Sequence, residues 1–420
     1  MKLKTVVLSL AVVGAVSLVL SGCGDTTASG NVELTLATNQ YNTEPAYLKL
    51  KELAETYNST HSGVTVDVQI LTDYEPTMKT KMAANDLPDL FFTHGWSTTR
   101  YAEYLEPLQD HEWAAKLSPL IKDRVTAEDG KVYVLPMEVS LGGVVFNSTV
   151  LDQAGVDWKS IQNWDDFQDA CVKIKAAGKT PIALGGLKDG WTVGNFMDFA
   201  MPSFLVTDES NNYRKELLDG SFDWNKSKPF FDMFNNYYDS GYFNSSALEG
   251  TNQDIIDLLA HDDAAFAFTQ TSIWTQIKEI NHESKIGIMP VPAYQQDDEP
   301  VAITGEGIAI GAWNKGKHKK EALDFIDWLS KPENINAISD TTLNPTGLQG
   351  DGYESSAGPF TDYYANIEKY RTFGYFDRDY LPSGMWDTLT KVGETLITKA
   401  GNESDVINKM QSDYDKLSKQ

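Results

Sequence analysis

Val32-Glu33-Leu34-Thr35-Leu36 alternates apolar and polar residues, and this alternation predicts a β-strand. A helix is expected next, because apolar residues recur at helical spacing from Ala46 to Tyr57 behind a proline. Residues 64–70 alternate again as a second strand, and a second helix around Met78 leads to Pro88-Asp89-Leu90-Phe91-Phe92. That last run has no polar alternation, which suits a strand buried on both faces. The order strand, helix, strand, helix, strand predicts an α/β fold with a parallel sheet and right-handed crossovers.

Helix and strand patterns continue to interleave along the rest of the chain. A helix is expected from Trp164-Asp165-Asp166, with Phe167, Cys171 and Ile174 on its apolar face. Cys171 is therefore expected to be a small core residue. The chain beyond about residue 340 is expected to be largely helical. Further strands are expected at Val132–Pro136, Val144–Phe146, Pro181–Leu184, Ala264–Phe268, Ile286–Met289 and Ile308–Ile310.

The N-terminus has the pattern of an export signal. Two lysines precede an uncharged run of 16 residues, Thr5–Leu20, which is shorter than the roughly 20 residues that a helix needs to cross a bilayer. Leu20-Ser21-Gly22-Cys23 follows at once and resembles the lipobox of bacterial lipoproteins, in which the thiol is diacylated and the preceding peptide bond is cut. The resemblance implies a lipoprotein signal peptide at residues 1–22, a lipidated Cys23 and a flexible tether at residues 23–30. A plain secretory signal with a chance cysteine is the alternative.

The composition indicates a large globular body behind this leader. The chain has 420 residues, of which 41% are hydrophobic, and this suffices for two lobes with separate cores. Cys171 is the one cysteine besides Cys23, so no disulfide framework is expected in spite of export. The net charge of −25 argues against nucleic acid and against an anionic membrane surface as partners. The membrane is therefore expected to be reached through the lipid anchor only.

Short motifs follow one another in a defined order along nearly all of the mature chain. They are Pro88-Asp89-Leu90-Phe91-Phe92, Gly130-Lys131-Val132-Tyr133-Val134-Leu135-Pro136, Phe146-Asn147 before a helix that ends at Ala154-Gly155, Asn163-Trp164-Asp165-Asp166-Phe167, Asp263-Ala264-Ala265-Phe266 through Trp274, and Gly305-Glu306-Gly307-Ile308-Ala309-Ile310 with the helix from Glu321 to Leu329. In their order and spacing these motifs resemble the family 1 extracellular solute-binding proteins of ABC transporters, the group that contains maltose-binding protein.

The resemblance implies a two-lobed periplasmic-binding-protein fold, with a hinge and a central ligand cleft. Each lobe would be a mainly parallel sheet flanked by helices. Residues 31–137 and about 305–335 would form lobe one, and about 138–304 and about 336–420 would form lobe two. Such lobes close on their ligand, and closure must be favoured by contacts that the closed state alone makes. The resemblance also implies the membrane permease of an ABC importer as partner. A monomer is expected on the outer face of the cytoplasmic membrane, which is extracellular in a Gram-positive bacterium.

Candidate ligand residues follow from the chemistry of a sugar, which offers hydroxyl groups and a flat apolar face to polar side chains and aromatic plates. Ligands of open α/β sheets bind at the carboxyl ends of strands. Asn39, Gln40 and Tyr41 leave one expected strand there, and His94 and Trp96 leave another. The resemblance adds Glu138, Ser140 and Glu306 near the hinge, and Trp191, Gln270, Trp274 and Trp386 in lobe two.

Structural roles are the alternative for all of these candidates. Loop packing could account for the residues behind the strands, a solvated loop for Glu138, and core burial for the tryptophans. The sequence also departs from maltose-binding protein at Thr93–Thr99, where an expected acidic residue is absent. A maltodextrin is therefore not expected as the ligand.

Common catalytic and metal-binding motifs are absent from the sequence. His-Glu-x-x-His, Gly-x-Ser-x-Gly and Cys-x-x-Cys do not occur. Residues 176–180 end like a phosphate loop, but Lys173 stands where its first glycine is needed, so we interpret them as a helix end. Asp297-Asp298-Glu299 and Asp377-Arg378-Asp379 lack the spacing of a calcium loop and are interpreted as solvated acidic turns. We expect no catalytic residue, no metal and no cofactor.

Three functions fit this sequence. The first, which we favour, is a lipoprotein that captures a carbohydrate, in particular an oligosaccharide, for an ABC importer. The second is a surface-anchored glycoside hydrolase, which would need two carboxyl groups roughly 5 to 9.5 Å apart. The third is a binding protein of the same fold for a peptide, a polyol or another ligand. A labelled oligosaccharide separates the first two, because an enzyme turns it over and a carrier retains it.

Replacing Cys23 by serine tests the lipid anchor, since it removes the thiol that the lipobox places for acylation. We expect the Cys23→Ser protein to lose its lipid label and to leave the detergent phase on phase partitioning. Cys171→Ser is the matched control and should keep the label. Unchanged detergent partitioning and retained labelling of the Cys23→Ser protein would contradict the anchor.

Overall fold

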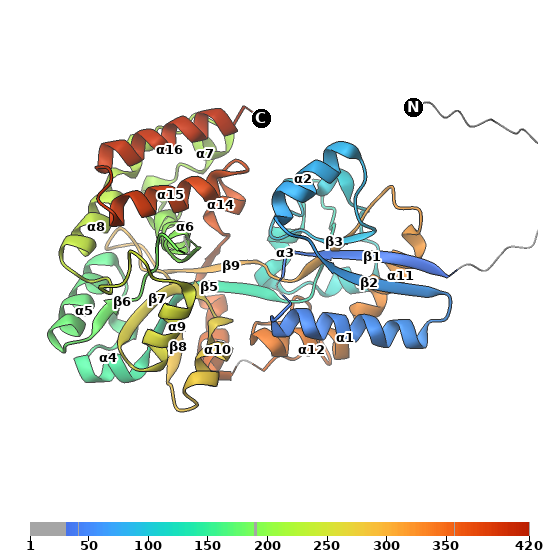
Figure 1. The fold of residues 1–420 in the computed structure, drawn as a ribbon, viewed down its shortest axis with the longest axis horizontal. Coiled ribbons are helices and arrows are strands. Elements are labelled where there is room, and N and C mark those ends of the chain that lie inside the picture. The colour runs from blue at the N-terminus through green and yellow to red at the C-terminus, as the bar shows by residue number, and fades with distance from the viewer. Residues whose placement is uncertain (1–30, 41, 189–190, 357, 420) are drawn as a thin grey trace, which may run out of the picture.

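The computed structural model describes residues 31–419, except residues 41, 189, 190 and 357. Two bodies of helices and strands lie side by side, and β5 (Val139–Asn147) and β9 (Val301–Glu306) run towards the junction between them (Figure 1). We call the body that contains the N-terminal strand the first lobe and the other body the second lobe. The expected leader, Cys23 and Tyr41 lie outside the described residues.

The first lobe is built on a five-stranded sheet. Its strands are β1 (Val32–Thr38), β2 (Val64–Ile70), β3 (Leu90–Phe92), β4 (Leu135–Pro136) and β10 (Ala309–Ala312), in the order β2-β1-β3-β10-β4. β1 pairs in parallel with β2 and with β3, which confirms the unit expected from residues 32–92. All three residues of β3 are buried, as a strand covered on both faces requires.

Helix α1 (Pro45–Thr60) shows why this unit folds as expected. Pro45 stands in its first turn, where the fixed φ of proline favours a helix start. Leu50, Leu53 and Tyr57 are buried on the face that the sequence predicts. The other helices of this lobe are α2 (Tyr74–Ala84), α3 (Pro119–Val125), α11 (Lys319–Leu329) and α12 (Pro332–Thr342), with short 3-10 turns at η1 (Ala102–Tyr104) and η2 (Glu112–Lys116).

The second lobe is built on a six-stranded sheet. Its strands are β5, β6 (Thr180–Ile182), β7 (Ala264–Gln270), β8 (Ile286–Met289), β9 and β11 (Arg371–Phe373). The order is β11-β9-β5-β7-β6, and β8 pairs with β5. The helices around the sheet are α4 (Ser148–Ala154), α5 (Trp164–Ala176), α6 (Trp191–Leu205), α7 (Arg214–Asp219), α8 (Lys228–Asp239), α9 (Asn252–Ala260), α10 (Ile273–Ile280), α13 (Thr361–Tyr364), α14 (Phe376–Asp379), α15 (Met385–Ile397) and α16 (Glu403–Leu417), with 3-10 turns at η3 (Trp158–Ser160), η4 (Glu209–Asn211), η5 (Trp224–Ser227), η6 (Gly358–Phe360) and η7 (Ile367–Lys369).

Helix α5 begins where its sequence predicts. The Asn163 side chain accepts from the backbone N–H of Asp166, and the Asp166 side chain accepts from the backbone N–H of Asn163, so the two form a capping box. Phe167, Cys171 and Ile174 are buried on its inner face. This confirms Cys171 as a core residue, and burial raises the pKa of its thiol.

Two expectations need correction, although the α/β class with two sheets flanked by helices is confirmed. The sheets are mixed and not mainly parallel, because β5 runs antiparallel to β7, β8 and β9. The physical reason is that β5 enters the second lobe and β9 returns to the first, so these neighbours run in opposite directions. The strand expected over Val132–Pro136 is shorter in the structure, where β4 covers Leu135–Pro136, because Val132 forms a separate β-bridge with Thr126.

Within the described chain, three segments lie together at the junction of the lobes, and we call them the hinge. They are residues 137–139, 306–309 and 343–347. The Met137 N–H donates to the Ile308 carbonyl at 2.8 Å, and the Val139 N–H donates to the Pro345 carbonyl at 2.8 Å. Backbone hydrogen bonds thus tie the three segments to one another. The exact division of the chain into lobes stays a prediction.

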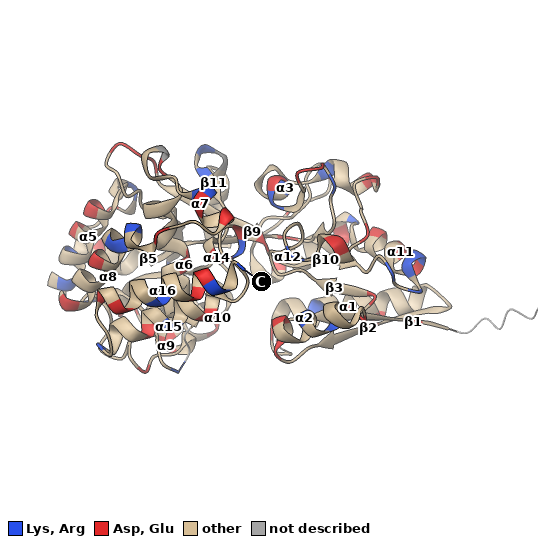
Figure 2. Cartoon of the chain, turned by 90° about the horizontal axis from the view of Figure 1, so that it is seen from above, with Lys and Arg blue, Asp and Glu red and all other residues tan. Residues whose placement is uncertain are grey.

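Apolar side chains form two large buried clusters, one centred on the first sheet and continuing past the hinge, the other within the second lobe. Acidic and basic residues are interspersed on the helices of both bodies (Figure 2). Some form pairs one helical turn apart, such as Lys320 with Asp324 and Lys409 with Asp413. None of the helices in the described part of the chain is long and apolar enough to span a bilayer.

Candidate functional site

Glu306 joins the hinge to the first lobe. It ends β9, and its buried carboxylate accepts hydrogen bonds from Thr93 Oγ1 at 2.5 Å, from the Gly95 N–H at 3.1 Å and from the Ser97 N–H at 3.2 Å. The Ser97 hydroxyl donates to it as well. Burial raises the pKa of this carboxyl, and the hydrogen bonds oppose the rise. Glu306 therefore holds the loop that follows β3 in the chain, residues 93–97, against the hinge.

His94 lies in that loop and bridges the two lobes. Its Nδ1 atom is 3.1 Å from Glu75 Oε1 on α2, and its Nε2 atom is 3.2 Å from Arg378 Nη2 on α14. Arginine can only donate, so Nε2 accepts and Nδ1 carries the proton. Burial and the charge of Arg378 lower the pKa of His94, while Glu75 opposes this. The side chain is still 35% exposed, so the ring can exchange protons with solvent.

Arg378 occupies the narrow space between the lobes. Its guanidinium lies 4.4 Å from the ring centroid of Tyr375 and 5.9 Å from that of Trp96, and its Nη1 atom is 3.4 Å from the Glu306 carbonyl. A Cβ atom at position 95 would collide with the Arg378 side chain, and Gly95 also has a φ of 94°. Only glycine meets both demands, so this loop is shaped to admit the arginine.

Two buried carboxyl groups lie beside Arg378. The Asp377 N–H donates to Asp198 Oδ1 at 2.7 Å, which joins α14 to α6. Asp198 is 1% exposed and Asp377 is 6% exposed. Burial raises the pKa of both carboxyls, and each responds to the other. Neighbouring carboxyls at such a site avoid double ionisation, so the pair is expected to share a proton.

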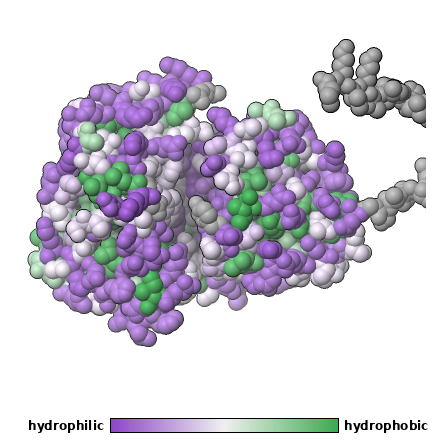
Figure 3. Space-filling model, in the orientation of Figure 1, coloured by the Kyte–Doolittle hydropathy of each residue, from purple (hydrophilic) through white to green (hydrophobic). Residues whose placement is uncertain are grey.

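These groups form one charged site between the lobes, which we call the interlobe cluster. Its members are Glu75, His94, Trp96, Arg100, Asp198, Glu306, Asp377 and Arg378. The space-filling view shows a furrow between the two bodies (Figure 3). The cluster offers guanidinium donors, carboxyl groups that can donate or accept, and an indole, all of which suit a hydroxyl-rich ligand.

The expected tryptophans occupy different environments. Trp96 is 5% exposed, and the Arg100 guanidinium stacks 3.7 Å from its ring centroid. Trp274 is also buried, with Lys278 Nζ 4.7 Å from its ring and Phe360 against its edge. Trp191 is 37% exposed at the start of α6. Burial of Trp96 and Trp274 fits a packing role, whereas the exposure of Trp191 suits an aromatic plate.

Trp386 lies in the first turn of α15, as the sequence predicts, and is half-buried. Its ring packs on α6 so closely that a Cβ at Gly194 would lie 2.9 Å from Trp386 Cζ2. Trp191 is one turn before Gly194 on the same helix, so the two indoles lie in one region of the second lobe.

The expected hinge residues bind neighbouring protein groups. Glu138 is buried and accepts from Thr342 Oγ1, and the pKa of its carboxyl is raised by burial and opposed by hydrogen bonds from Thr342 and Asn344. Ser140 Oγ is 2.7 Å from the Tyr375 hydroxyl. Gln270, at the end of β7, hydrogen-bonds the same tyrosine, and this lowers the pKa of Tyr375 against the dominant effect of burial.

The residues that follow β1 in the chain are partly buried beside the first sheet. The Gln40 N–H donates to Thr38 Oγ1 at 3.1 Å. Gln40 Oε1 is buried and has no hydrogen-bond partner within the described chain. Asn39 is half-buried, and Tyr41 lies outside the described residues.

Sequence reasoning missed Asp198, Asp377 and Arg378 of the second lobe, and Glu75 and Arg100 of the first lobe. Asp377-Arg378-Asp379 was expected to be a solvated turn, and this is wrong for Asp377, which burial and Arg378 keep away from water. In the turn at 297–299 only Asp298 departs from the expectation, because it pairs with Arg371 and its side chain is 14% exposed, whereas Asp297 and Glu299 are exposed as expected. Asp198 had a usable signal, since it interrupts the apolar run of α6. No sequence signal indicated Arg100, because Trp96, on which its guanidinium stacks, lies four residues away in a loop.

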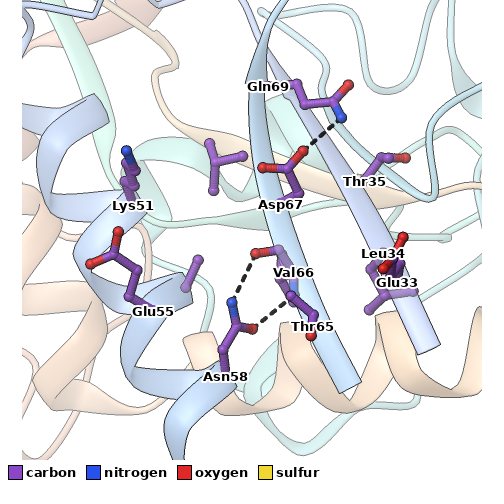
Figure 4. A pocket seen from close by; sticks show the side chains of 12 residues that line it. Glu33, Leu34, Thr35, Lys51, Glu55, Asn58, Thr65, Val66, Asp67 and Gln69 are labelled. Carbon is purple, nitrogen blue, oxygen red and sulfur yellow. Dashed lines mark hydrogen bonds between the residues drawn. The ribbon is translucent and has the colours of Figure 1, made fainter. Parts of the chain in front are cut away.

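Two hollows outside the cluster each belong to a single lobe. One, of about 370 Å³, lies among residues 158–162, 289–300 and 362–370 of the second lobe. The other, of about 420 Å³, lies between α1 and the strands β1 and β2 (Figure 4). There the Asn58 carboxamide accepts from the Val66 N–H at 2.7 Å and donates to the Val66 carbonyl at 3.1 Å. Asn58 therefore satisfies the open edge of β2, which is a structural role.

The described part of the chain contains no group of three or more His, Cys, Asp or Glu side chains that could hold a metal ion. In the interlobe cluster, Glu75 contacts His94, Asp198 and Asp377 contact each other beside Arg378, and Glu306 accepts from Thr93, Gly95 and Ser97.

Comparison with known proteins identifies relatives along the whole described chain. The family model for bacterial extracellular solute-binding proteins matches residues 41–335. The melibiose/raffinose/stachyose-binding protein of Bacillus subtilis is 31% identical over 409 residues, which are 96% of this chain and 95% of the relative. A B. subtilis binding protein in an open conformation superposes with a TM-score of 0.87 at 30% identity, over 94% of this chain and 99% of that one. A Bacillus licheniformis sugar transporter in complex with stachyose gives a TM-score of 0.82 at 30% identity, over 92% of this chain and 100% of that one.

Removal of the Glu306 carboxylate should destabilise the junction of the lobes. Glu306→Ala leaves the buried donors of Thr93, Gly95 and Ser97 without an acceptor, so we expect a loss of about 3 kcal/mol or more in the free energy of unfolding. Glu306→Gln keeps one acceptor oxygen and should lose less. Denaturant titration measures both. The exposed Glu279, replaced by alanine, is the control and should change stability by less than about 0.5 kcal/mol. An equal, small change in Glu306→Ala would refute the role assigned to Glu306.

Proposed function

Because the chain belongs to the bacterial extracellular solute-binding protein family, whose members bind substrates and are not enzymes, we propose that it captures an oligosaccharide for import. The sugar we infer is of the melibiose, raffinose and stachyose series, since the relative that binds these sugars is 31% identical over nearly its whole length. The stachyose complex at 30% identity supports the same choice.

The observation that carries the proposal is the interlobe cluster beside the half-exposed tryptophans. Oligosaccharide recognition needs fixed hydrogen-bonding groups for hydroxyls and rigid aromatic faces for C–H surfaces. Arg378, Asp377 and Asp198 supply the first, and their geometry is set by the contacts of α14 with α6 and with the loop behind β3. Trp386 and Trp191 supply the second on the same lobe. We propose that the sugar lies between them and the first lobe.

We further propose how capture leads to transport. The two lobes close about the hinge on the bound sugar, and the closed form docks on the permease of an ABC importer. In this proposal the protein is a monomer held at the outer face of the cytoplasmic membrane by acyl chains on Cys23, because two chains give stable anchoring where one gives marginal binding. The sequence-based division gives residues 31–137 and about 305–335 to lobe one and about 138–304 and about 336–420 to lobe two, and we extend lobe one to the end of α12 at Thr342, because α12 packs on α1.

Binding of defined sugars tests the proposed function. Isothermal titration with stachyose, raffinose and melibiose should give one site per chain for at least one of them, and chromatography should recover the sugar intact. Maltotriose is the control and should not bind, because the acidic residue expected near Thr93–Thr99 of a maltodextrin carrier is absent. Hydrolysis of the sugar, or the absence of binding for all three, would contradict the proposal.

Trp386→Ala should weaken sugar binding by more than tenfold and leave the fold largely intact. An aromatic plate in a desolvated site contributes roughly 2 kcal/mol or more on truncation. The half-exposed indole is not part of either buried cluster, so the melting temperature without sugar should change little. Trp224→Ala is the contrasting variant, because Trp224 is fully buried and its loss should cost roughly 3 to 5 kcal/mol of stability. Unchanged affinity, or a large drop in melting temperature, would exclude Trp386 as the plate.

A further inference from the structure

His94 is placed to hold Arg378 and has no free ring nitrogen for a ligand. Nδ1 is used by Glu75 on α2, and Nε2 is used by Arg378 on α14. Arg378, in contrast, has five N–H donors and is seen to use two nitrogens, towards His94 Nε2 and the Glu306 carbonyl. The remaining donors of its planar guanidinium can face a ligand.

We propose that His94 is a positioning residue for the Arg378 guanidinium, that it acts only as a neutral imidazole, and that its protonation weakens sugar capture. This inference rests on the proposed function, because it places Arg378 on the ligand side of the lobe junction.

The geometry makes the contact incompatible with a charged ring. A protonated imidazole carries an N–H on both nitrogens, so Nε2–H would face the N–H of Arg378 across 3.2 Å. Two donors and two positive charges then oppose each other. Glu75 keeps a partner in either state, since its carboxylate accepts from Nδ1–H in both. The ring therefore stays with the first lobe and the guanidinium of the second lobe loses its support.

The charges around His94 determine the pH range of this change. The charged groups that face it are Glu75 on α2 and Asp377 and Arg378 on α14. Arg100 and Tyr101 lie next to Glu75, and Glu306 lies next to Arg378. Burial and Arg378 lower the pKa of His94 and outweigh Glu75 and Asp377, which raise it. The released ring has the ordinary value of about 6.5. The contact is therefore complete above about pH 6.5 and is lost as the pH falls through the lowered value.

Other groups of the cluster titrate in the acidic range as well. The pKa values of Glu306, Asp198 and Asp377 are raised by burial, so these carboxyls take up protons more readily than exposed ones. A pH profile of the wild type alone would combine all of these effects. A variant that removes only the imidazole is needed to isolate His94.

The experiment is a titration with stachyose at about pH 8 and about pH 5.5, which lie on either side of the histidine range. Wild-type affinity should fall at the lower pH by up to about tenfold, because a ring whose pKa lies below about 6.5 stays at least about one-tenth neutral at about pH 5.5. The affinity of His94→Gln should fall less than that of the wild type, because the amide can accept from Arg378 and donate to Glu75 without titrating, and only the response of the carboxyls remains. The exposed His261 is the matched control, and His261→Gln should keep the wild-type profile. An equal pH response in His94→Gln and wild type would overturn the proposal.

A second measurement uses the sugar-free protein and separates this proposal from the function itself. Nitrogen-15 NMR of the histidine rings, assigned by the signal missing from His94→Gln, should show the Nδ1–H tautomer at about pH 8 and titration below about pH 6.5. Arg378→Gln should raise the pKa of His94, because it removes the opposing charge. An Nε2–H tautomer, or titration at or above the ordinary value, would refute the positioning role. If no sugar binds at any pH, the proposed function fails while the NMR result still decides the state of His94.

Discussion

The buried carboxylate of Glu306 is the interaction on which the arrangement of the lobes depends. It stands at the end of β9, where the chain leaves the second sheet, and it accepts four hydrogen bonds from the loop behind β3. Removal of the carboxylate would leave these donors unsatisfied, and an unsatisfied buried donor destabilises the fold by more than an ordinary hydrogen bond stabilises it. The loop that carries His94 and Trp96 is therefore placed by a group of the hinge. The hinge itself is held by backbone hydrogen bonds among its three segments.

The short helix α14 extends this coupling from the other side. Arg378 meets His94, and the next residue, Asp379, forms an ion pair with Arg124 of α3 at 2.7 Å. Two adjacent residues of opposite charge thus reach complementary partners on the first lobe. Asp377 anchors the same helix to α6 through Asp198. A change in one of these groups is felt by the others, because they share a site of low water content where charges interact strongly. The lobes are linked by polar contacts that can be exchanged, which suits the proposed opening and closing.

The carboxyls of the interlobe cluster show how burial gives polar residues new roles. Sequence reasoning interpreted the 377–379 triplet as solvated because acidic turns usually are. In the folded chain, arginines compensate the loss of water around Asp377 and Asp379, and the pKa of both carboxyls is still raised by burial. Glu138 and Glu306, which were expected to face a ligand, are satisfied by protein donors instead. The ligand-facing roles of the expected residues stay a prediction, and the structure adds Arg378, Asp377 and Asp198 to the candidates.

The sequence by itself determined the local structure and the fold class. Alternation placed β1 and β2, helical spacing placed α1 and α5 with their buried faces, and the Asn163 cap marked where α5 begins, because these signals act between residues close in the chain. The motif order led to the family. Only the tertiary structure decided strand direction in the second sheet and the membership of the interlobe cluster. His94 and Arg378 are 284 residues apart, and Thr93 and Glu306 are 213 apart. No local pattern reports contacts of that separation, because they arise from how two lobes and three hinge segments pack together in space.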